Sequence, residues 1–183
     1  MNGMAIPLIG FAAYSGTGKT TLLVRLIRIF REGGLRVGMV KHAHHNFEID
    51  HPGKDSFELR KAGASQMYIC SGTRWALMVE REPGPLDSLQ DHINRMDTNN
   101  LDLILVEGFK PAVIPKIELY RPALRKPLLF PEDSSIIAVA TDSTERLRTE
   151  LPVLDLNNPE AIAGFISERF LDHHPAATAG NTL

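Results

Sequence analysis

The sequence has one cysteine, Cys70, among 183 residues, and this scarcity excludes an internal disulfide and a four-cysteine metal site. It lacks a long uninterrupted apolar run and its first residues include no basic segment, so neither a membrane span nor a signal peptide is predicted. The formal net charge of -2 gives no general attraction to nucleic acid or to an anionic membrane. These absences favour a cytoplasmic protein that holds any anionic ligand by local contacts.

Short apolar runs alternate with amphipathic segments along the chain, and this order predicts an α/β fold with a mostly parallel, twisted sheet and helices on both faces. Strands are expected near residues 6–12, 35–42, 101–109, 115–121, 134–142 and 151–158, and helices near 20–32, 55–64, 86–96 and 159–171. Two further β-rich runs, 66–71 and 74–80, predict an antiparallel hairpin.

The strongest functional signal is the stretch FAAYSGTGKTTLL, residues 11–23, which matches the phosphate-binding loop G-x-x-x-x-G-K-[ST] except at Ala13. Such a loop works because small residues let successive backbone N–H groups turn around an anion at a helix N-terminus. A methyl group at Ala13 is tolerable there if φ stays negative. A glycine turn that only caps a helix is the alternative. The predicted phosphate-binding residues are Ser15, Gly16, Thr17, Gly18, Lys19, Thr20 and Thr21.

This loop predicts a P-loop NTPase-like nucleotide-binding domain over residues 1–171, followed by a tail at 172–183 that lacks periodicity and is expected to be disordered. Lys19 is expected to assist catalysis at the β and γ phosphates, and Thr20 to bind Mg²⁺.

Carboxylates that could assist the metal are expected where strands end. Glu107 directly follows the apolar run 103–106 and is predicted as a catalytic and Mg²⁺-assisting acid, with a solvated strand-end charge as its alternative. Asp102 begins the same run and is rejected because it lies about five residues, at about 3.3 Å each, from that end. Asp50, in the loop after the second predicted strand, is favoured as a further contact to Mg²⁺ through water.

The choice of base depends on Asp142, which ends the apolar run AVATD. No N-K-x-D motif is present, but a carboxylate in this place favours guanine over adenine, with a turn-forming aspartate as the alternative. The histidines His42, His44 and His45 raise the possibility of a metal site, but alternation along an extended segment puts His45 on the opposite face from the other two. Their role is left open.

Together these segments resemble the molybdopterin-guanine dinucleotide biosynthesis protein B family. The matching pieces are FAAYSGTGKTTLL, GMVKHAHHNFEIDHPGKDSFELRKAGA, RWALMVE, MDTNNLDLILVEGFK and IIAVATD. The resemblance implies a GTP-binding homodimer that uses Mg²⁺ and has weak GTPase activity. Its implied partners are a separate guanylyltransferase, protein A of the same pathway, which joins GMP to molybdopterin, and molybdopterin or its guanine dinucleotide. It carries over residues 16–21 for phosphate, Thr20 for Mg²⁺ and Glu107 as the strand-end acid, and makes Arg60 and Lys61 candidates for a cofactor or partner surface.

Two other functions stay open. A small-molecule P-loop kinase would need a general base and an arginine-rich lid, whereas residues 111–133 offer only Arg121, Arg125 and Lys126. A metal-delivery GTPase would depend on the histidines and lacks paired cysteines. The predicted hairpin is a candidate edge for the dimer interface.

Overall fold

The computed structural model describes residues 6–43, 47–82, 84, 87–143 and 147–171. It divides into two compact units: unit 1, Met1–His42 with Ser88–Leu183, and unit 2, Ala43–Asp87. The single domain expected over residues 1–171 stays a prediction. The expected tail, residues 172–183, and the two histidines His44 and His45 lie outside the described residues.

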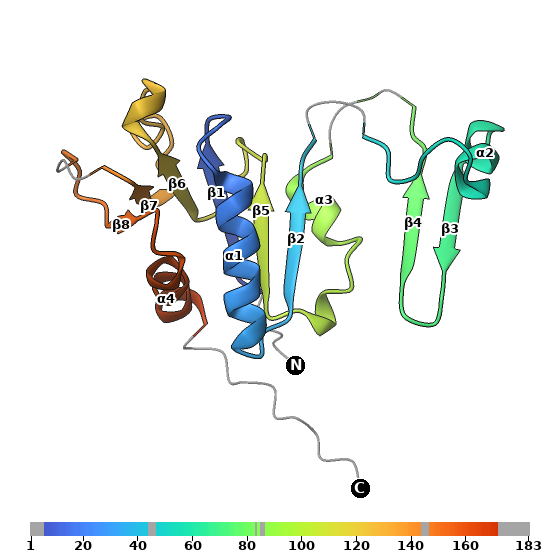
Figure 1. The fold of residues 1–183 in the computed structure, drawn as a ribbon, viewed down its shortest axis with the longest axis horizontal. Coiled ribbons are helices and arrows are strands. Elements are labelled where there is room, and N and C mark those ends of the chain that lie inside the picture. The colour runs from blue at the N-terminus through green and yellow to red at the C-terminus, as the bar shows by residue number, and fades with distance from the viewer. Residues whose placement is uncertain (1–5, 44–46, 83, 85–86, 144–146, 172–183) are drawn as a thin grey trace, which may run out of the picture. The chain divides into compact units, whose positions relative to one another are not determined.

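Unit 1 is built on a six-stranded sheet in the order β2-β5-β1-β6-β7-β8 (Figure 1). Every neighbouring pair of strands is parallel, as predicted. The carboxyl ends of the strands therefore share one edge, called the carboxyl edge below. The strands are β1 (Leu8–Ala13), β2 (Val37–Lys41), β5 (Leu103–Glu107), β6 (Lys116–Tyr120), β7 (Ile136–Thr141) and β8 (Val153–Asp155).

Helices cover both faces of this sheet because successive residues of a strand point to opposite sides. In β5, Leu103 and Leu105 belong to a buried cluster that includes side chains of α1 (Lys19–Glu32) and α4 (Pro159–Phe170). Ile104 and Val106 belong to a second cluster with α3 (Leu89–Ile93). The predicted helices on both faces are thus confirmed.

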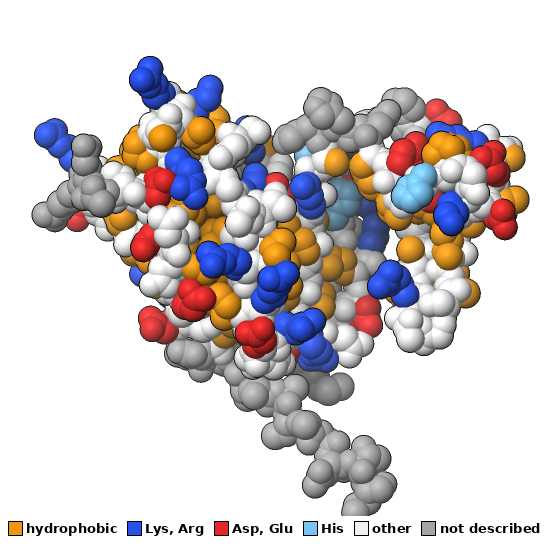
Figure 2. All heavy atoms as spheres, viewed as in Figure 1, with side chains coloured by type: hydrophobic (Ala, Val, Ile, Leu, Met, Phe, Trp, Pro, Cys, Tyr) orange, Lys and Arg blue, Asp and Glu red, His pale blue; other side chains and the backbone are white. Residues whose placement is uncertain are grey.

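The helix α1 follows the glycine-rich loop and packs its apolar stripe on the sheet. Gly18 precedes it with φ of 94°, which is accessible to glycine and strained for other residues. Its opposite face exposes Arg25, Arg28 and Arg31. Figure 2 shows Lys and Arg side chains around α1. This polarity is the one that the helical period predicts.

The helix α3 is shorter than the apolar pattern over residues 86–96 predicts. Ser88 and Asp91 form a capping box that begins it, and Asn94 follows its last residue. A short 3-10 helix, η1 (Thr98–Asn100), then leads toward β5.

The chain after β6 is fastened to the sheet by Glu118, whose side chain is buried. Its two carboxylate oxygens accept hydrogen bonds from the backbone N–H groups of Leu129 at 2.7 Å and Phe130 at 2.9 Å. Burial raises the pKa of Glu118 although both hydrogen bonds favour the charged form. The segment between, which includes the 3-10 helix η2 (Pro122–Leu124), is therefore anchored at both ends.

Unit 2 contains α2 (Asp55–Lys61) and the predicted antiparallel hairpin, β3 (Gln66–Cys70) with β4 (Trp75–Val79). Among its described residues Met78 is the only large apolar side chain that is buried, at 8% exposed. Apolar burial therefore contributes little to the stability of this unit.

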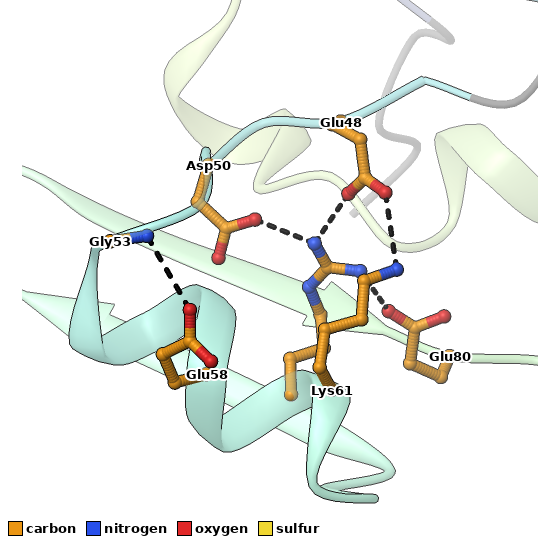
Figure 3. Close-up of polar contacts among 7 residues, drawn as sticks. Glu48, Asp50, Gly53, Glu58, Lys61 and Glu80 are labelled. Carbon is orange, nitrogen blue, oxygen red and sulfur yellow. Dashed lines mark hydrogen bonds and ion pairs between the residues drawn. The ribbon is translucent and has the colours of Figure 1, made fainter.

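An ionic cluster centred on Arg60 joins the other parts of unit 2. The guanidinium, 8% exposed, pairs with Asp50 at 2.6 Å, with Glu80 at 2.8 Å and with Glu48. Figure 3 shows these three carboxylates pointing toward one guanidinium. Arg60 lowers the pKa of Asp50 and of Glu48 by direct hydrogen bonds. Arg60 is thus enclosed by its own unit, while Lys61, 52% exposed, lies at the rim of the cluster beside Glu48 and the Phe57 ring.

Candidate phosphate-binding site

The glycine-rich loop follows β1 at the carboxyl edge and turns back sharply before α1. Gly16 has φ of 83° and Gly18 has φ of 94°. Between them Thr17 is buried, and its hydroxyl donates a hydrogen bond of 2.6 Å to the Tyr14 carbonyl. Ala13 is the last residue of β1 and has no positive φ, which meets the condition set for its methyl group. The loop therefore has the turn that a phosphate cradle needs.

Lys19 and Glu107 meet at this edge. The Lys19 ammonium lies 3.2 Å from one carboxylate oxygen of Glu107, and the Lys41 ammonium lies 3.6 Å from the other. The strand register explains the arrangement, since Glu107 ends β5 opposite Phe11 of β1 on one side and Lys41 of β2 on the other. The sequence placed Lys19 and Glu107 at this edge in separate roles, and it predicted neither their ion pair nor the contact with Lys41. Asp102, as expected, is elsewhere, paired with Arg36 at 2.9 Å.

The remaining loop residues differ in what they can offer a ligand. Ser15, Thr20 and Thr21 are exposed, whereas the Thr17 hydroxyl is used within the loop. The Thr20 hydroxyl and the Glu107 carboxylate are hard oxygen donors of the kind that Mg²⁺ accepts. No group of three or more metal-binding side chains occurs in the described parts of the chain. A bound Mg²⁺ would therefore take its other ligands from phosphate and water.

The segment after β6 lies against this loop, which sequence reasoning did not anticipate. The Arg121 guanidinium donates a hydrogen bond of 2.7 Å from Nε to the Thr17 carbonyl. The Lys126 ammonium lies 6.0 Å from the centre of the Tyr14 ring. The position of Arg121 in the sequence could have indicated a role at the site. It directly follows a strand, at the edge where ligands bind in open parallel sheets.

Asp142 and Asp50 have different surroundings. Asp142 follows β7 at the carboxyl edge, and its carboxylate is paired with Arg121, so the predicted base-reading group is linked to the phosphate loop through that arginine. Asp50 belongs to unit 2 and is paired there with Arg60. Its contact with Mg²⁺ stays a prediction.

His42 lies beside the end of β5. Its backbone N–H donates to the Glu107 carbonyl at 2.9 Å, and its ring centre is 5.4 Å from that of Phe109. A Cβ atom on Gly108 would lie 2.8 Å from the His42 carbonyl oxygen, so this close approach of two backbone segments requires glycine.

None of the helices among the described residues is long and apolar enough to span a membrane.

Comparison with known proteins gives one consistent result. The family model described as molybdopterin guanine dinucleotide synthesis protein B matches residues 8–142. The chain is 50% identical over 164 residues to the molybdopterin-guanine dinucleotide biosynthesis adapter protein of Escherichia coli (strain K12), covering 89% of this chain and 93% of the relative. It is 45% identical to the adapter protein of the same description from Haemophilus influenzae, covering 94% and 93%.

Solved structures agree with the fold. A crystal structure described as molybdopterin-guanine biosynthesis protein B shares 28% identity and a TM-score of 0.67, over 88% of this chain and 98% of that one. The crystal structure of Bacillus subtilis MobB shares 26% identity and a TM-score of 0.69, over 89% and 98%. The predicted fold class is confirmed by these structures and by the sheet topology.

Proposed function

The chain belongs to the molybdopterin guanine dinucleotide synthesis protein B family, and we propose that it is a cytoplasmic GTP-binding accessory protein that assists attachment of GMP to molybdopterin. Its relatives are described as adapter proteins of this biosynthesis. The observation that carries the nucleotide part of the proposal is the meeting of Lys19 and Glu107, 3.2 Å apart, beside the loop turned at Gly16 and Gly18.

In this proposal each group of the site has one task. Backbone N–H groups of residues 15–20 surround the phosphates, and Lys19 leaves Glu107 to neutralise the β and γ oxygens. Thr20 and Glu107 would hold Mg²⁺, the latter through water, and the metal would neutralise charge on the phosphates.

Hydrolysis is expected to be slow. An arginine that stabilises charge at the γ-phosphate accelerates such reactions by several orders of magnitude. Arg121, the arginine seen against the loop, is bonded to the Thr17 carbonyl and to Asp142 instead. This arrangement supports an accessory role, in which bound GTP stabilises a complex with the guanylyltransferase, over rapid turnover.

The proposal is tested by adding the chain to purified molybdopterin, the guanylyltransferase, GTP and Mg²⁺, and following dinucleotide formation. We expect GTP to bind more tightly than ATP and the dinucleotide yield to rise with the chain present. Tighter binding of ATP, or rapid phosphorylation of a small metabolite by the chain alone, would favour the kinase alternative. Stoichiometric Zn²⁺ or Ni²⁺ binding that His44→Ala abolishes would favour the metal-delivery alternative.

The homodimer is proposed to form through the hairpin of unit 2. One face of the hairpin, defined by the register pairs Tyr68 with Leu77 and Cys70 with Trp75, is exposed along its length. Tyr68 is 57% exposed, Trp75 60% and Leu77 46%. Figure 2 shows apolar side chains at the surface over the hairpin. A two-stranded sheet is marginal alone, and an isologous contact would bury the same patch on both copies.

We therefore expect Trp75→Glu to convert a dimer into a monomer, as measured by sedimentation equilibrium. Val113→Glu is the matched control, because Val113 is an apolar side chain of unit 1 that is 93% exposed and should leave the mass unchanged. Cys70, on the same face as Trp75, should give a covalent dimer under mild oxidation of the wild type. A wild-type monomer, or a Trp75→Glu dimer, contradicts this interface.

A further inference from the structure

Arg121 makes two contacts that the proposed chemistry does not use. Its Nε donates to the Thr17 carbonyl at 2.7 Å, and its Nη1 pairs with the Asp142 carboxylate. Its Nη2 would lie 3.5 Å from a Cβ atom placed on Gly18. The Arg121 side chain, 30% exposed, therefore lies against the turn that leads into α1.

The Thr17 carbonyl belongs to the peptide that joins Thr17 to Gly18, and Gly16 and Gly18 on either side of Thr17 have positive φ. The direction of this carbonyl therefore decides how the neighbouring N–H groups point. A phosphate cradle needs its N–H groups turned inward and its carbonyl oxygens turned away from the anion. Two hydrogen bonds fix the position of Thr17. Arg121 donates to its carbonyl oxygen, and its own hydroxyl donates to the Tyr14 carbonyl at 2.6 Å.

Asp142 fixes the direction of this guanidinium. A fork of guanidinium donors can satisfy a carbonyl and a carboxylate at once only in a narrow range of orientations. The two residues come from the ends of neighbouring strands, β6 and β7, so the sheet sets their separation. Asp142 was nominated from the sequence as a base-reading group, and it has a second task here.

We propose that Arg121 is a positioning residue for phosphate binding: oriented by Asp142, it holds the Thr17 carbonyl so that the loop N–H groups face the anion. This rests on the proposed function only in requiring that the loop binds a triphosphate. It adds that Asp142 influences phosphate affinity even for a ligand that has no base.

The test measures Mg²⁺-dependent binding of inorganic tripolyphosphate and of GTP by calorimetry. Arg121→Met should weaken both by the same factor, about tenfold, which is the loss of roughly one hydrogen bond to a charged group. Arg125→Met removes the same charge from the same segment and is the matched control, expected to bind both ligands as the wild type does. Arg121→Lys keeps one donor and should recover part of the affinity.

Asp142→Asn gives the second arm. If Asp142 acts by orienting Arg121, Asp142→Asn weakens tripolyphosphate binding, and the double variant with Arg121→Met is no weaker than Arg121→Met alone. Wild-type tripolyphosphate affinity in Arg121→Met overturns the inference. Loss of GTP affinity alone in Asp142→Asn, with tripolyphosphate unaffected, overturns the orienting role and leaves Asp142 as a base contact. The melting temperature of each variant is measured beside its affinity. Equal melting temperatures in the variants compared exclude a merely structural effect.

These outcomes are separable from those that test the proposed function. A wild type that binds tripolyphosphate but prefers ATP to GTP, or leaves the guanylyltransferase unaffected, fails the proposed function while the ratios among the Arg121 variants still decide the inference. A wild type that binds no tripolyphosphate overturns the inference directly.

Discussion

Lys19→Ala is expected to weaken GTP binding by about a hundredfold, because it removes a charged donor to the phosphates worth up to about 3 kcal/mol. The structure adds a second reason. Lys19 lies 3.2 Å from Glu107, so its removal also leaves a carboxylate, 13% exposed, facing the incoming phosphates with less compensation. Titration calorimetry with GTP and Mg²⁺ measures the loss.

Lys41→Ala is the matched control for this prediction. Lys41 contacts the same carboxylate at 3.6 Å but belongs to β2 and is 57% exposed, so its loss should weaken GTP binding only a few-fold. An equal loss of GTP affinity in the two variants would mean that binding depends on the net charge around Glu107 and not on a direct contact from Lys19. Unchanged GTP binding in Lys19→Ala would overturn the assignment of the phosphate loop. Lys41→Ala should keep the wild-type melting temperature within a few degrees, because Lys41 is 57% exposed and exposed ion pairs contribute little to stability.

Much of unit 1 could be predicted because its signals are local. The run 103–106 is apolar on both faces, as a central parallel strand requires, and β5 occupies it. The meeting of Lys19 and Glu107 follows from the same rule, since the carboxyl ends of parallel strands share an edge. The effect of Ala13 in place of the first glycine of the motif could also be evaluated from the sequence, because a methyl group is tolerated there if φ stays negative.

The contacts that could not be predicted join residues that are far apart in the sequence and that no helical or strand periodicity relates. Arg121 and Thr17 are 104 positions apart, and nothing in either segment marks the other as its partner. The hairpin shows a different limit. Its apolar residues predicted the strands, but a pattern that is apolar on both faces does not say which face is covered, and Tyr68, Trp75 and Leu77 are exposed. Arg60, offered as a candidate partner contact, is enclosed by three carboxylates of its own unit.

Arg60→Met is expected to unfold unit 2 while unit 1 stays folded. The variant leaves the three carboxylates of the ionic cluster facing one another without their cation, in a unit whose one large buried apolar side chain among the described residues is Met78. Backbone amides of residues 47–82 should lose most of their protection in hydrogen exchange at pH 7, whereas β1 and β5 should keep theirs. Lys61→Met is the control, because Lys61 is 52% exposed and its one ion pair in the described part of unit 2 is with Glu48, at 3.4 Å, so protection should stay unchanged.

The pH dependence of the same variant provides an independent test. Arg60 lowers the pKa of Asp50 and Glu48, so the folded unit favours their charged forms more than the unfolded chain does. That stabilisation is present above the ordinary values of about 4 and is lost as the pH falls through the folded values. In Arg60→Met the carboxylates repel one another, so acidification should restore order to unit 2 instead of removing it. Trp75, the only tryptophan, lies in unit 2 and stacks on Tyr68 with ring centres 5.7 Å apart, so its fluorescence reports on this unit and not on unit 1. If wild type and Arg60→Met lose the folded Trp75 signal together on acidification, the ionic cluster does not hold unit 2 together.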